Sequence, residues 1–284
     1  DEPLPYAFSV DGIEISTSLH KDIIQGLKKS TEDVIKIVYQ PQAIFKVRAV
    51  TRCSSTLNGH KDAMVYTNTE RSICIGVLAL QGAFLEHIHI LQRIPQVSRV
   101  VPVRTAEQLD SVDALIVPGG ESTAISLVAE RSGLIEPLRK FVRSKPTWGT
   151  CAGMILLANK ANRTKKGGQS LIGGLDITVN RNEFGSQIDS FESAIQINHI
   201  TSSSSDLFPA VFIRAPIISS INSPDVEVLA RLQCSTGETD VSAIVAVKQG
   251  HLLATAFHPE LTNDDRIHGF FVKVAIDFLN EKKS

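Results

Sequence analysis

The 284-residue chain carries 29 Lys and Arg residues against 30 Asp and Glu residues, so its formal net charge is −1. Its content of 43% hydrophobic and 21% charged residues is typical of a globular protein with one large domain or two smaller ones. Because there is no basic excess, we expect neither nucleic acid nor an anionic membrane as a direct partner. The apolar runs also stop short of the roughly 18 residues that a membrane-spanning helix needs.

The first residues and the cysteines favour a cytoplasmic protein. The start, DEPLPYAF, is acidic and lacks the apolar segment of a signal peptide. The cysteines show neither a C-x-x-C pair nor a zinc-ligand spacing, which favours a reducing compartment and predicts no metal site. They are Cys53, Cys74, Cys151 and Cys234.

Residues 1–63 are expected to form a small unit of their own. Asp11-Gly12 joins two short alternating runs, as in a type I′ hairpin, and a helix-like segment and two more strand-like runs follow. In chain order the five segments are residues 6–10, 13–15, 19–29, 34–39 and 43–50. Two strands, a helix and two further strands predict a ubiquitin-like β-grasp fold.

A family resemblance supports this interpretation. The stretch YQPQAIFKVRAVTRCSSTLNGH at residues 39–60, together with PYAFSV and STED, resembles the N-terminal ubiquitin-like domain of Notchless-type ribosome-assembly proteins. In that family a WD40 propeller follows, whereas here an unrelated sequence begins at Met64, as in a gene fusion or a gene-model artefact. The resemblance implies that Glu32 completes a metal site on a large AAA ATPase; alternatively, Glu32 is only a solvated acid.

Residues 64–72 are polar and predict a linker, and residues 73–284 form the second expected domain. It opens with an apolar run at 73–80 that is typical of a buried parallel strand. A helix to about residue 93, a strand at 99–103, a short helix at 106–109 and a strand at 114–117 are expected next. This alternation predicts a doubly wound, mostly parallel α/β sheet, whose sites form at the carboxyl ends of strands.

The strand at 114–117 runs into a glycine-rich turn, PGGEST at 118–123, at the start of another expected helix. A tetrahedral oxyanion needs two fixed N–H donors, and an amide of the Gly119-Gly120 turn could be one of them. The turn could instead cradle a phosphate, but no G-K-[ST] follows. We therefore expect no cofactor.

The segment GTCAG at 149–153 has the form of a nucleophile elbow, a tight strand-to-helix turn flanked by small residues. Residues 154–158 are typical of the first turns of a helix, so Cys151 is expected at a helix N-terminus, where the dipole favours the nucleophilic thiolate. The amide of Ala152 would be the second oxyanion donor. A single cysteine is more often a buried apolar side chain, so the motif needs a partner.

That partner is expected in TAFHPE at 255–260, after an apolar run at 252–257 that predicts a strand. An imidazole accepts the thiol proton and returns a proton to the leaving group, while a carboxylate fixes the orientation of the imidazole. His258 and Glu260 would thus complete a triad with Cys151. The alternative is a surface turn in which neither side chain meets the cysteine.

The remaining segments predict further strands, polar loops and a last helix. Strand-like runs occur at 175–180, 194–197, 210–213 and 244–247, and polar stretches at 167–169 and 202–205 predict surface loops. A helix at 266–279 would place one apolar face in the core. That face comprises Ile267, Phe270, Phe271, Val274 and Phe278.

Six blocks across residues 73–279 resemble one family, the glutaminase subunit of pyridoxal 5′-phosphate synthase, a class I glutamine amidotransferase. The blocks are LQG at 80–82, PGGEST at 118–123, GTCAG at 149–153, RNEFG at 181–185, FIRAP at 212–216 and FHPE at 257–260. The resemblance implies hydrolysis of L-glutamine to glutamate and ammonia by Cys151, His258 and Glu260. It also implies an oxyanion site at Gly120 and Ala152. The implied glutamine-binding residues are Gly120, Glu121, Ser122, Arg181, Ile213 and Arg214.

Members of this family pass ammonia through a protein tunnel to a synthase subunit, and their activity is usually weak until they dock on it. The resemblance therefore implies two partners, L-glutamine and this synthase subunit, with Gln81 beside the loop that docking completes. Two alternatives remain: a ribosome-assembly adaptor that acts through residues 1–63, and a cysteine hydrolase or pseudoenzyme on the same fold.

Overall fold

The computed structural model describes residues 8–10, 13–15, 34–38, 44–48, 72–162, 169–181, 190–236 and 239–282. The chain separates into two units, Asp1–Val65 and Tyr66–Ser284. Among the described residues, no helix is long and apolar enough to cross a membrane.

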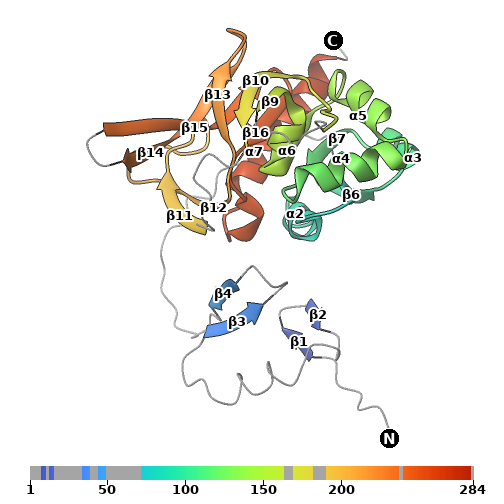
Figure 1. Ribbon diagram of the computed structural model, residues 1–284. Coiled ribbons are helices and arrows are strands. Elements are labelled where there is room, and N and C mark those ends of the chain that lie inside the picture. The colour runs from blue at the N-terminus through green and yellow to red at the C-terminus, as the bar shows by residue number, and fades with distance from the viewer. Residues whose placement is uncertain are drawn as a thin grey trace, which may run out of the picture. The chain divides into compact units, whose positions relative to one another are not determined.

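Two hairpins are described in the first unit (Figure 1). Strand β1 (Phe8–Val10) pairs antiparallel with β2 (Ile13–Ile15), and β3 (Val34–Val38) pairs antiparallel with β4 (Ile44–Arg48). The two hairpins form separate two-stranded sheets. The helix expected at residues 19–29, like Glu32 and the linker at 64–71, lies outside the described residues, so the ubiquitin-like fold stays a prediction.

The second unit is built on a ten-stranded sheet with the order β6-β5-β7-β8-β16-β15-β13-β10-β9, in which β14 pairs with β15. These strands are β5 (Ile73–Leu78), β6 (Val97–Val103), β7 (Ala114–Val117), β8 (Thr147–Thr150), β9 (Ala158–Asn162), β10 (Leu175–Asn180), β13 (Ile217–Ile221), β14 (Glu227–Thr236), β15 (Thr239–Gln249) and β16 (Leu252–Thr255). The five strands from β6 to β16 run parallel, whereas β15, β13 and β14 join by antiparallel pairs. The sheet is therefore mixed, and its parallel half agrees with the expected doubly wound fold.

Two of the antiparallel pairs, β14 with β15 and β15 with β16, follow from short chain connections. Only residues 237–238 separate β14 from β15, and only residues 250–251 separate β15 from β16. Parallel neighbours need a crossover of a dozen or more residues, so such short connections force antiparallel pairing. A separate hairpin of β11 (Ser190–Ile195) and β12 (Phe208–Ile213) packs beside the sheet.

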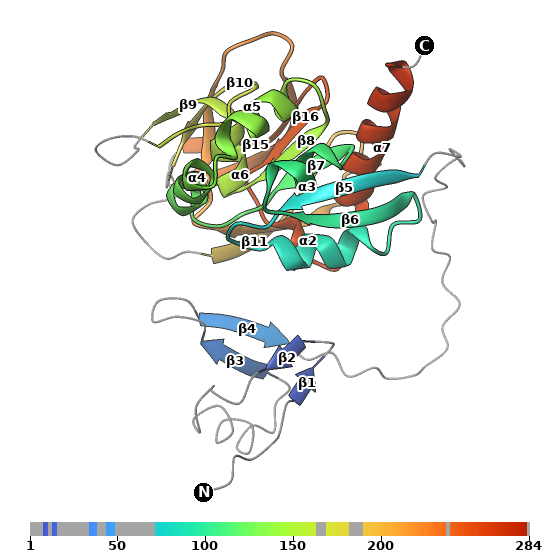
Figure 2. The ribbon, with the colours of Figure 1, turned by 90° about the vertical axis from the view of Figure 1, so that its right-hand side faces the viewer.

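Helices cover both faces of the parallel strands (Figures 1 and 2). On one face, α3 (Ala106–Asp110), α4 (Ser122–Arg131), α5 (Ile135–Val142) and α6 (Ala152–Leu157) contact one another. On the other, α2 (Phe84–Leu91) meets α7 (Arg266–Glu281) through a contact between His87 and His268. Since side chains alternate across a strand, β8 directs Trp148 and Thr150 toward α2 and α7, and Gly149 toward α6.

The buried face of α7, which packs into a mostly aliphatic core, differs from the sequence prediction. Ile267 and Phe271 are buried as expected, but Phe270, Val274 and Phe278 are only half-buried. His268, Val272, Ala275 and Ile276 take their place, because the face in contact with the sheet is rotated toward the histidine. A polar residue at the centre of a buried face breaks the apolar pattern on which the prediction rested.

Candidate active site

Three neighbouring parallel strands end at the same edge of the sheet and bring the predicted motifs together. Strand β8 lies between β7 and β16, with Val117 opposite Gly149 and Thr150 opposite Thr255. The residues that follow these strands are the glycine turn, the cysteine elbow and the histidine turn. The site thus lies at the carboxyl edge, as the α/β pattern predicts.

Cys151 occupies a strained turn between β8 and α6. Its φ of 46° and ψ of −102° are unusual for a residue with a side chain, and its amide donates to the Thr255 carbonyl at 2.8 Å. The flanking glycines are required by packing: a Cβ on Gly153 would lie 1.9 Å from the Val117 carbonyl oxygen, and one on Gly149 would lie 2.5 Å from the Gly153 backbone. This geometry is that of a nucleophile elbow.

His258 and Glu260 lie beside this elbow in a buried turn after β16. His258 Nδ1 is 2.7 Å from Glu260 Oε1, and both residues are at most 7% exposed. A Cβ on Gly119 would lie 2.3 Å from His258 Cε1 and 3.4 Å from Cys151 Cβ, so the glycine turn touches both side chains. The structure therefore brings the thiol, the imidazole and the carboxylate together under the Gly119 turn.

The charges of this cluster shift both pKa values in the direction that favours an ion pair. Burial alone would lower the pKa of His258, but the Cys151 thiolate, which also hydrogen-bonds to the ring, and Glu260 raise it well above 6.5. Burial would raise the pKa of Glu260, but His87 and the hydrogen bond to His258 hold it below the ordinary value of 4.5. His258 is accordingly set to carry a proton beside the Cys151 sulfur.

The glycine turn is held in place by the segment after β5. The Ala83 amide donates to the Gly119 carbonyl at 3.1 Å, and the Glu121 amide donates to Gln81 Oε1 at 2.9 Å. Because the C=O and N–H of a trans peptide point in opposite directions, the Gly120 N–H points away from Ala83. Ala152 is the first residue of α6, where the helix leaves its N–H without an intrahelical partner.

The predicted glutamine-binding residues come from three elements around the turn. Glu121 caps α4 by accepting from the Thr123 and Ala124 amides at 3.1 and 2.7 Å, and it also accepts from Arg181 Nη2 at 3.3 Å. These backbone bonds and Arg181 outweigh burial and lower the pKa of Glu121, which therefore stays ionised. Its carboxylate has a structural role.

Strand β12 brings the other two predicted residues to the site. The His258 amide donates to the Val211 carbonyl at 2.8 Å, which fixes the end of β12 beside the histidine turn. Ile213 ends this strand half-buried, and Arg214 follows with a φ of 42° and an exposed side chain. Of the predicted block RNEFG at 181–185, only Arg181 is described, and residues 182–185 lie outside the described residues.

Three residues that contact the site residues or extend their cluster were not predicted from the sequence. Gln169 Oε1 accepts from Ser122 Oγ at 3.2 Å and from Thr123 Oγ1 at 3.3 Å, while its buried Nε2 has no hydrogen-bond partner among the described residues. His87 and His268 extend the cluster behind Glu260. No local signal marks any of them, because each stands among ordinary polar or helical residues.

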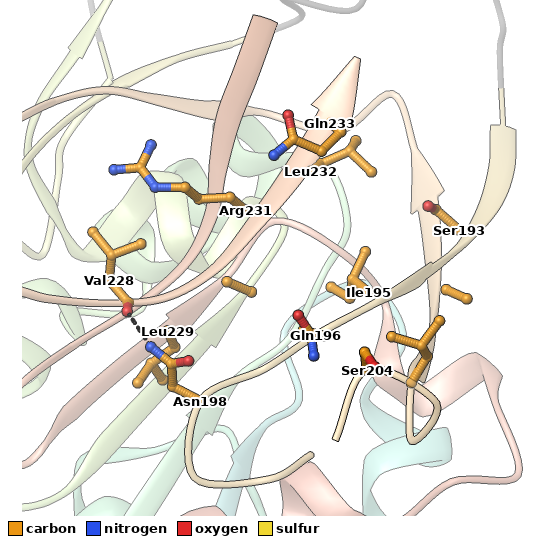
Figure 3. A pocket seen from close by; sticks show the side chains of 13 residues that line it. Ser193, Ile195, Gln196, Asn198, Ser204, Val228, Leu229, Arg231, Leu232 and Gln233 are labelled. Atoms are coloured by element: carbon orange, nitrogen blue, oxygen red, sulfur yellow. Dashed lines mark hydrogen bonds between the residues drawn. The ribbon is translucent and has the colours of Figure 1, made fainter. Parts of the chain in front are cut away.

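A pocket of about 540 Å³ lies elsewhere in the unit, between β11, β14 and the segment at 196–207 (Figure 3). Asn198 lies against the edge of β14, where its Nδ2 donates to the Val228 carbonyl at 3.1 Å. None of the predicted catalytic or glutamine-binding residues lines this pocket. Within the described ranges, no group of three or more His, Cys, Asp or Glu side chains is placed to hold a metal ion.

Comparison with known proteins assigns the second unit. Residues 77–277 match the SNO glutamine amidotransferase family. The chain is 49% identical over 219 residues to "Probable pyridoxal 5′-phosphate synthase subunit PDX2" of Arabidopsis thaliana, covering 70% of this chain and 85% of that protein. It is 46% identical over 205 residues to "Pyridoxal 5′-phosphate synthase subunit PdxT" of Dehalococcoides mccartyi, covering 72% and 98%.

Solved structures agree with this assignment. A structure described as "Crystal structure of glutamine amidotransferase" superposes with a TM-score of 0.60 at 42% identity, over 71% of this chain and 98% of that one. A putative GMP synthase protein of Thermoplasma acidophilum shares the fold at 16% identity, with a TM-score of 0.51 over 75% and 99% of the two chains. The chain therefore belongs to the SNO glutamine amidotransferase family.

Proposed function

We propose that Cys151, His258 and Glu260 carry out the hydrolysis of L-glutamine. The family and the relatives make the chain a glutaminase subunit of pyridoxal 5′-phosphate synthase, which supplies ammonia for vitamin B6 synthesis. The observation that carries the assignment of residues is the buried His258–Glu260 pair, which faces the Cys151 elbow across the Gly119 turn.

In this mechanism the Cys151 thiolate attacks the side-chain amide carbon of glutamine and forms a tetrahedral oxyanion. The amides of Gly120 and Ala152 donate to this oxyanion. His258 then gives its proton to the departing nitrogen, so that ammonia leaves and a glutamyl thioester remains. His258 next takes a proton from water, which attacks the thioester and releases glutamate and the thiolate. Glu260 holds the imidazole in one orientation throughout.

The amino-acid end of glutamine is proposed to bind where two predicted arginines lie, with different roles for each. A guanidinium group is suited to the α-carboxylate because it can donate two parallel hydrogen bonds. Arg214 is exposed beside β12, whereas Arg181 is already paired with Glu121. We assign the direct contact to Arg214 and to backbone groups of Gly120, Ser122 and Ile213, and we assign to Arg181 and Glu121 the support of the loop.

Substitution of the proposed nucleophile tests the mechanism. We expect Cys151→Ala to lower ammonia release from glutamine by roughly 10³-fold or more, with the synthase subunit present, because no other group can form the thioester. The matched control is Cys74→Ala, since Cys74 is also a free cysteine but lies on β5. Near-normal turnover by the Cys151 variant would exclude the proposed nucleophile.

We also propose the domain division expected from the sequence: a ubiquitin-like unit at 1–63, a linker at 64–72 and the glutaminase domain at 73–284. The sequence resemblance favours a second function for the first unit, namely binding to a ribosome-assembly AAA ATPase through Glu32. A binding assay of the full chain with that ATPase checks this function. We expect Glu32→Ala to weaken the complex with the ATPase. Equal binding by the wild-type chain and the Glu32→Ala variant would count against this second function.

A further inference from the structure

Two histidines that the mechanism does not use are fully buried behind the proposed triad. His87 on α2 and His268 on α7 each have no exposed surface, and both pack against Trp148 of β8. Burial lowers the pKa of His87 and, more strongly, that of His268, so both rings are neutral at neutral pH. Buried polar groups cost stability unless they are paired, so this arrangement calls for a role.

The two rings form a chain of contacts that ends at the free oxygen of Glu260. His268 Nε2 is 2.9 Å from His87 Nδ1, and His87 Nε2 is 3.3 Å from both Glu260 Oε2 and Thr150 Oγ1. Glu260 Oε1 is used by His258, whereas Oε2 is buried and has no aligned hydrogen bond among the described residues. His87 is therefore the group that faces the unsatisfied oxygen.

The charge of Glu260 selects the tautomer of His87. A lone pair on Nε2 would face a carboxylate and be repelled by it, so the proton belongs on Nε2, where it is hydrogen-bonded to Thr150 Oγ1 and lies 3.3 Å from Oε2. His87 Nδ1 then accepts from His268 Nε2–H. His268 Nδ1 is left as a buried acceptor, which fits the lack of a hydrogen-bond partner for it in the described part of the chain and costs less than an unpaired buried donor would.

We propose that His87 is a positioning residue for the triad, which holds the second oxygen of Glu260 through its Nε2–H and is itself oriented by His268. This inference rests on the proposed catalytic role of Glu260. With both oxygens held, the carboxylate keeps one rotamer and stays ionised, and it stabilises the imidazolium of His258. The His87 contact thereby favours the thiolate–imidazolium pair at Cys151.

Each titratable group near the His268–His87–Glu260 contacts favours or opposes a positive charge on one of the histidines. Cys151 and Glu260 raise the pKa of His258. Glu260 favours a charge on His87 and His258 opposes it, while His87 and Arg93 oppose a charge on His268. Loss of the His87 N–H would make the Glu260 carboxylate, and hence the His258 imidazolium, less favourable. The Cys151 thiolate would then form only at higher pH.

The test is the pH dependence of Cys151 alkylation by iodoacetamide in the full chain, followed by mass spectrometry of the Cys151 peptide. Gln at position 87 can place an N–H near the Nε2 position, whereas Asn reaches only the Nδ1 position and Leu offers no donor. We expect His87→Gln to keep the wild-type midpoint. His87→Asn and His87→Leu should raise it by about one pH unit, the size expected when a buried carboxylate loses a donor.

The controls separate a positioning role from a merely structural one. His251→Asn removes the donor of another histidine contact, from the half-buried His251 Nε2 to the Val142 carbonyl at the opposite end of β16, and should leave the midpoint unchanged. A lower melting temperature with an unshifted midpoint in His87→Asn would overturn the proposal, as would equal shifts in the Gln and Asn variants. If His87→Leu fails to fold, the Gln and Asn pair decides. Alkylation needs no glutamine turnover, so an inactive wild type would count against the proposed function alone.

Discussion

At the scale of single residues, the His258–Glu260 pair makes stability depend on pH. The pKa of Glu260 is lowered, so its contribution is present above the ordinary value of 4.5 and is lost as the pH falls through the folded pKa. The pKa of His258 is raised, so its contribution is present below 6.5 and is lost as the pH rises through the folded pKa. Both contributions are therefore present between about pH 4.5 and 6.5.

We expect Glu260→Gln to lower the free energy of unfolding by about 3 kcal/mol in this window, because it leaves a buried imidazolium without its counter-charge. The deficit should shrink toward both lower and higher pH. Urea denaturation of both chains across the pH range measures it. Glu227→Gln, which removes an exposed partner of His199, is the control and should cost well under about 1 kcal/mol. A deficit that does not vary with pH would show that the pair is not charged.

At the scale of elements, the elbow between β8 and α6 depends on two glycines that cannot accept a methyl group. Gly153 lies inside α6, where Ala is intrinsically better than Gly by about 1 kcal/mol. Any loss of stability in Gly153→Ala must therefore come from the clash with the Val117 carbonyl.

We expect Gly153→Ala to cost about 1–3 kcal/mol net and to lower glutaminase activity, since moving α6 displaces Cys151 and the Ala152 amide. Thermal unfolding and ammonia release measure the two effects. Gly250→Ala is the matched control: its φ of 55° disfavours a side chain, but a Cβ there meets nothing within 4 Å. This control should lose stability and keep its activity. Unchanged stability and activity in Gly153→Ala would contradict the proposed packing.

The elements that the sequence predicts are those whose apolar pattern matches their burial. Strands β5, β7, β10 and β16 are continuous or alternating apolar runs, and they occur at the expected places. The edge strand β9, with the sequence ANKAN, carries polar residues, and β13 reads IISSI, so neither has a pattern that separates it from a loop. Helix α5, which carries Pro137 in its first turn, was not predicted.

The site residues also fall into two groups, those that a local sequence pattern marks and those that it does not. The elbow, the glycine turn and the histidine turn are short contiguous motifs, so the sequence could indicate them. The contacts of His87 and His268 depend on the packing of α2 against α7 across 181 positions of the chain. No local pattern encodes such a pairing, and a buried histidine in a helix resembles an exposed one.

At the scale of the whole molecule, the described groups of the proposed site all belong to the second unit. They extend from Gln81 to Glu260, whereas the units divide between Val65 and Tyr66. The Dehalococcoides relative is matched over 98% of its own length by 72% of this chain, so that protein has no counterpart of the remainder. We therefore expect the fold and the chemistry of the glutaminase to require nothing from residues 1–63.

Removal of the first 63 residues should accordingly leave a folded, active enzyme. We expect a chain that starts at Met64 to keep the melting temperature of the second unit. With the synthase subunit present, its kcat/KM should lie within about twofold of the value for the full chain. The reason is that both proposed catalytic turns keep their supporting strands. A chain that starts at Val77 is the control. It lacks the buried Ile73 and Ile75 of β5, the strand that links β6 to β7, and should unfold. A folded but inactive Met64 chain would instead mean that residues 1–63 act on the glutaminase site.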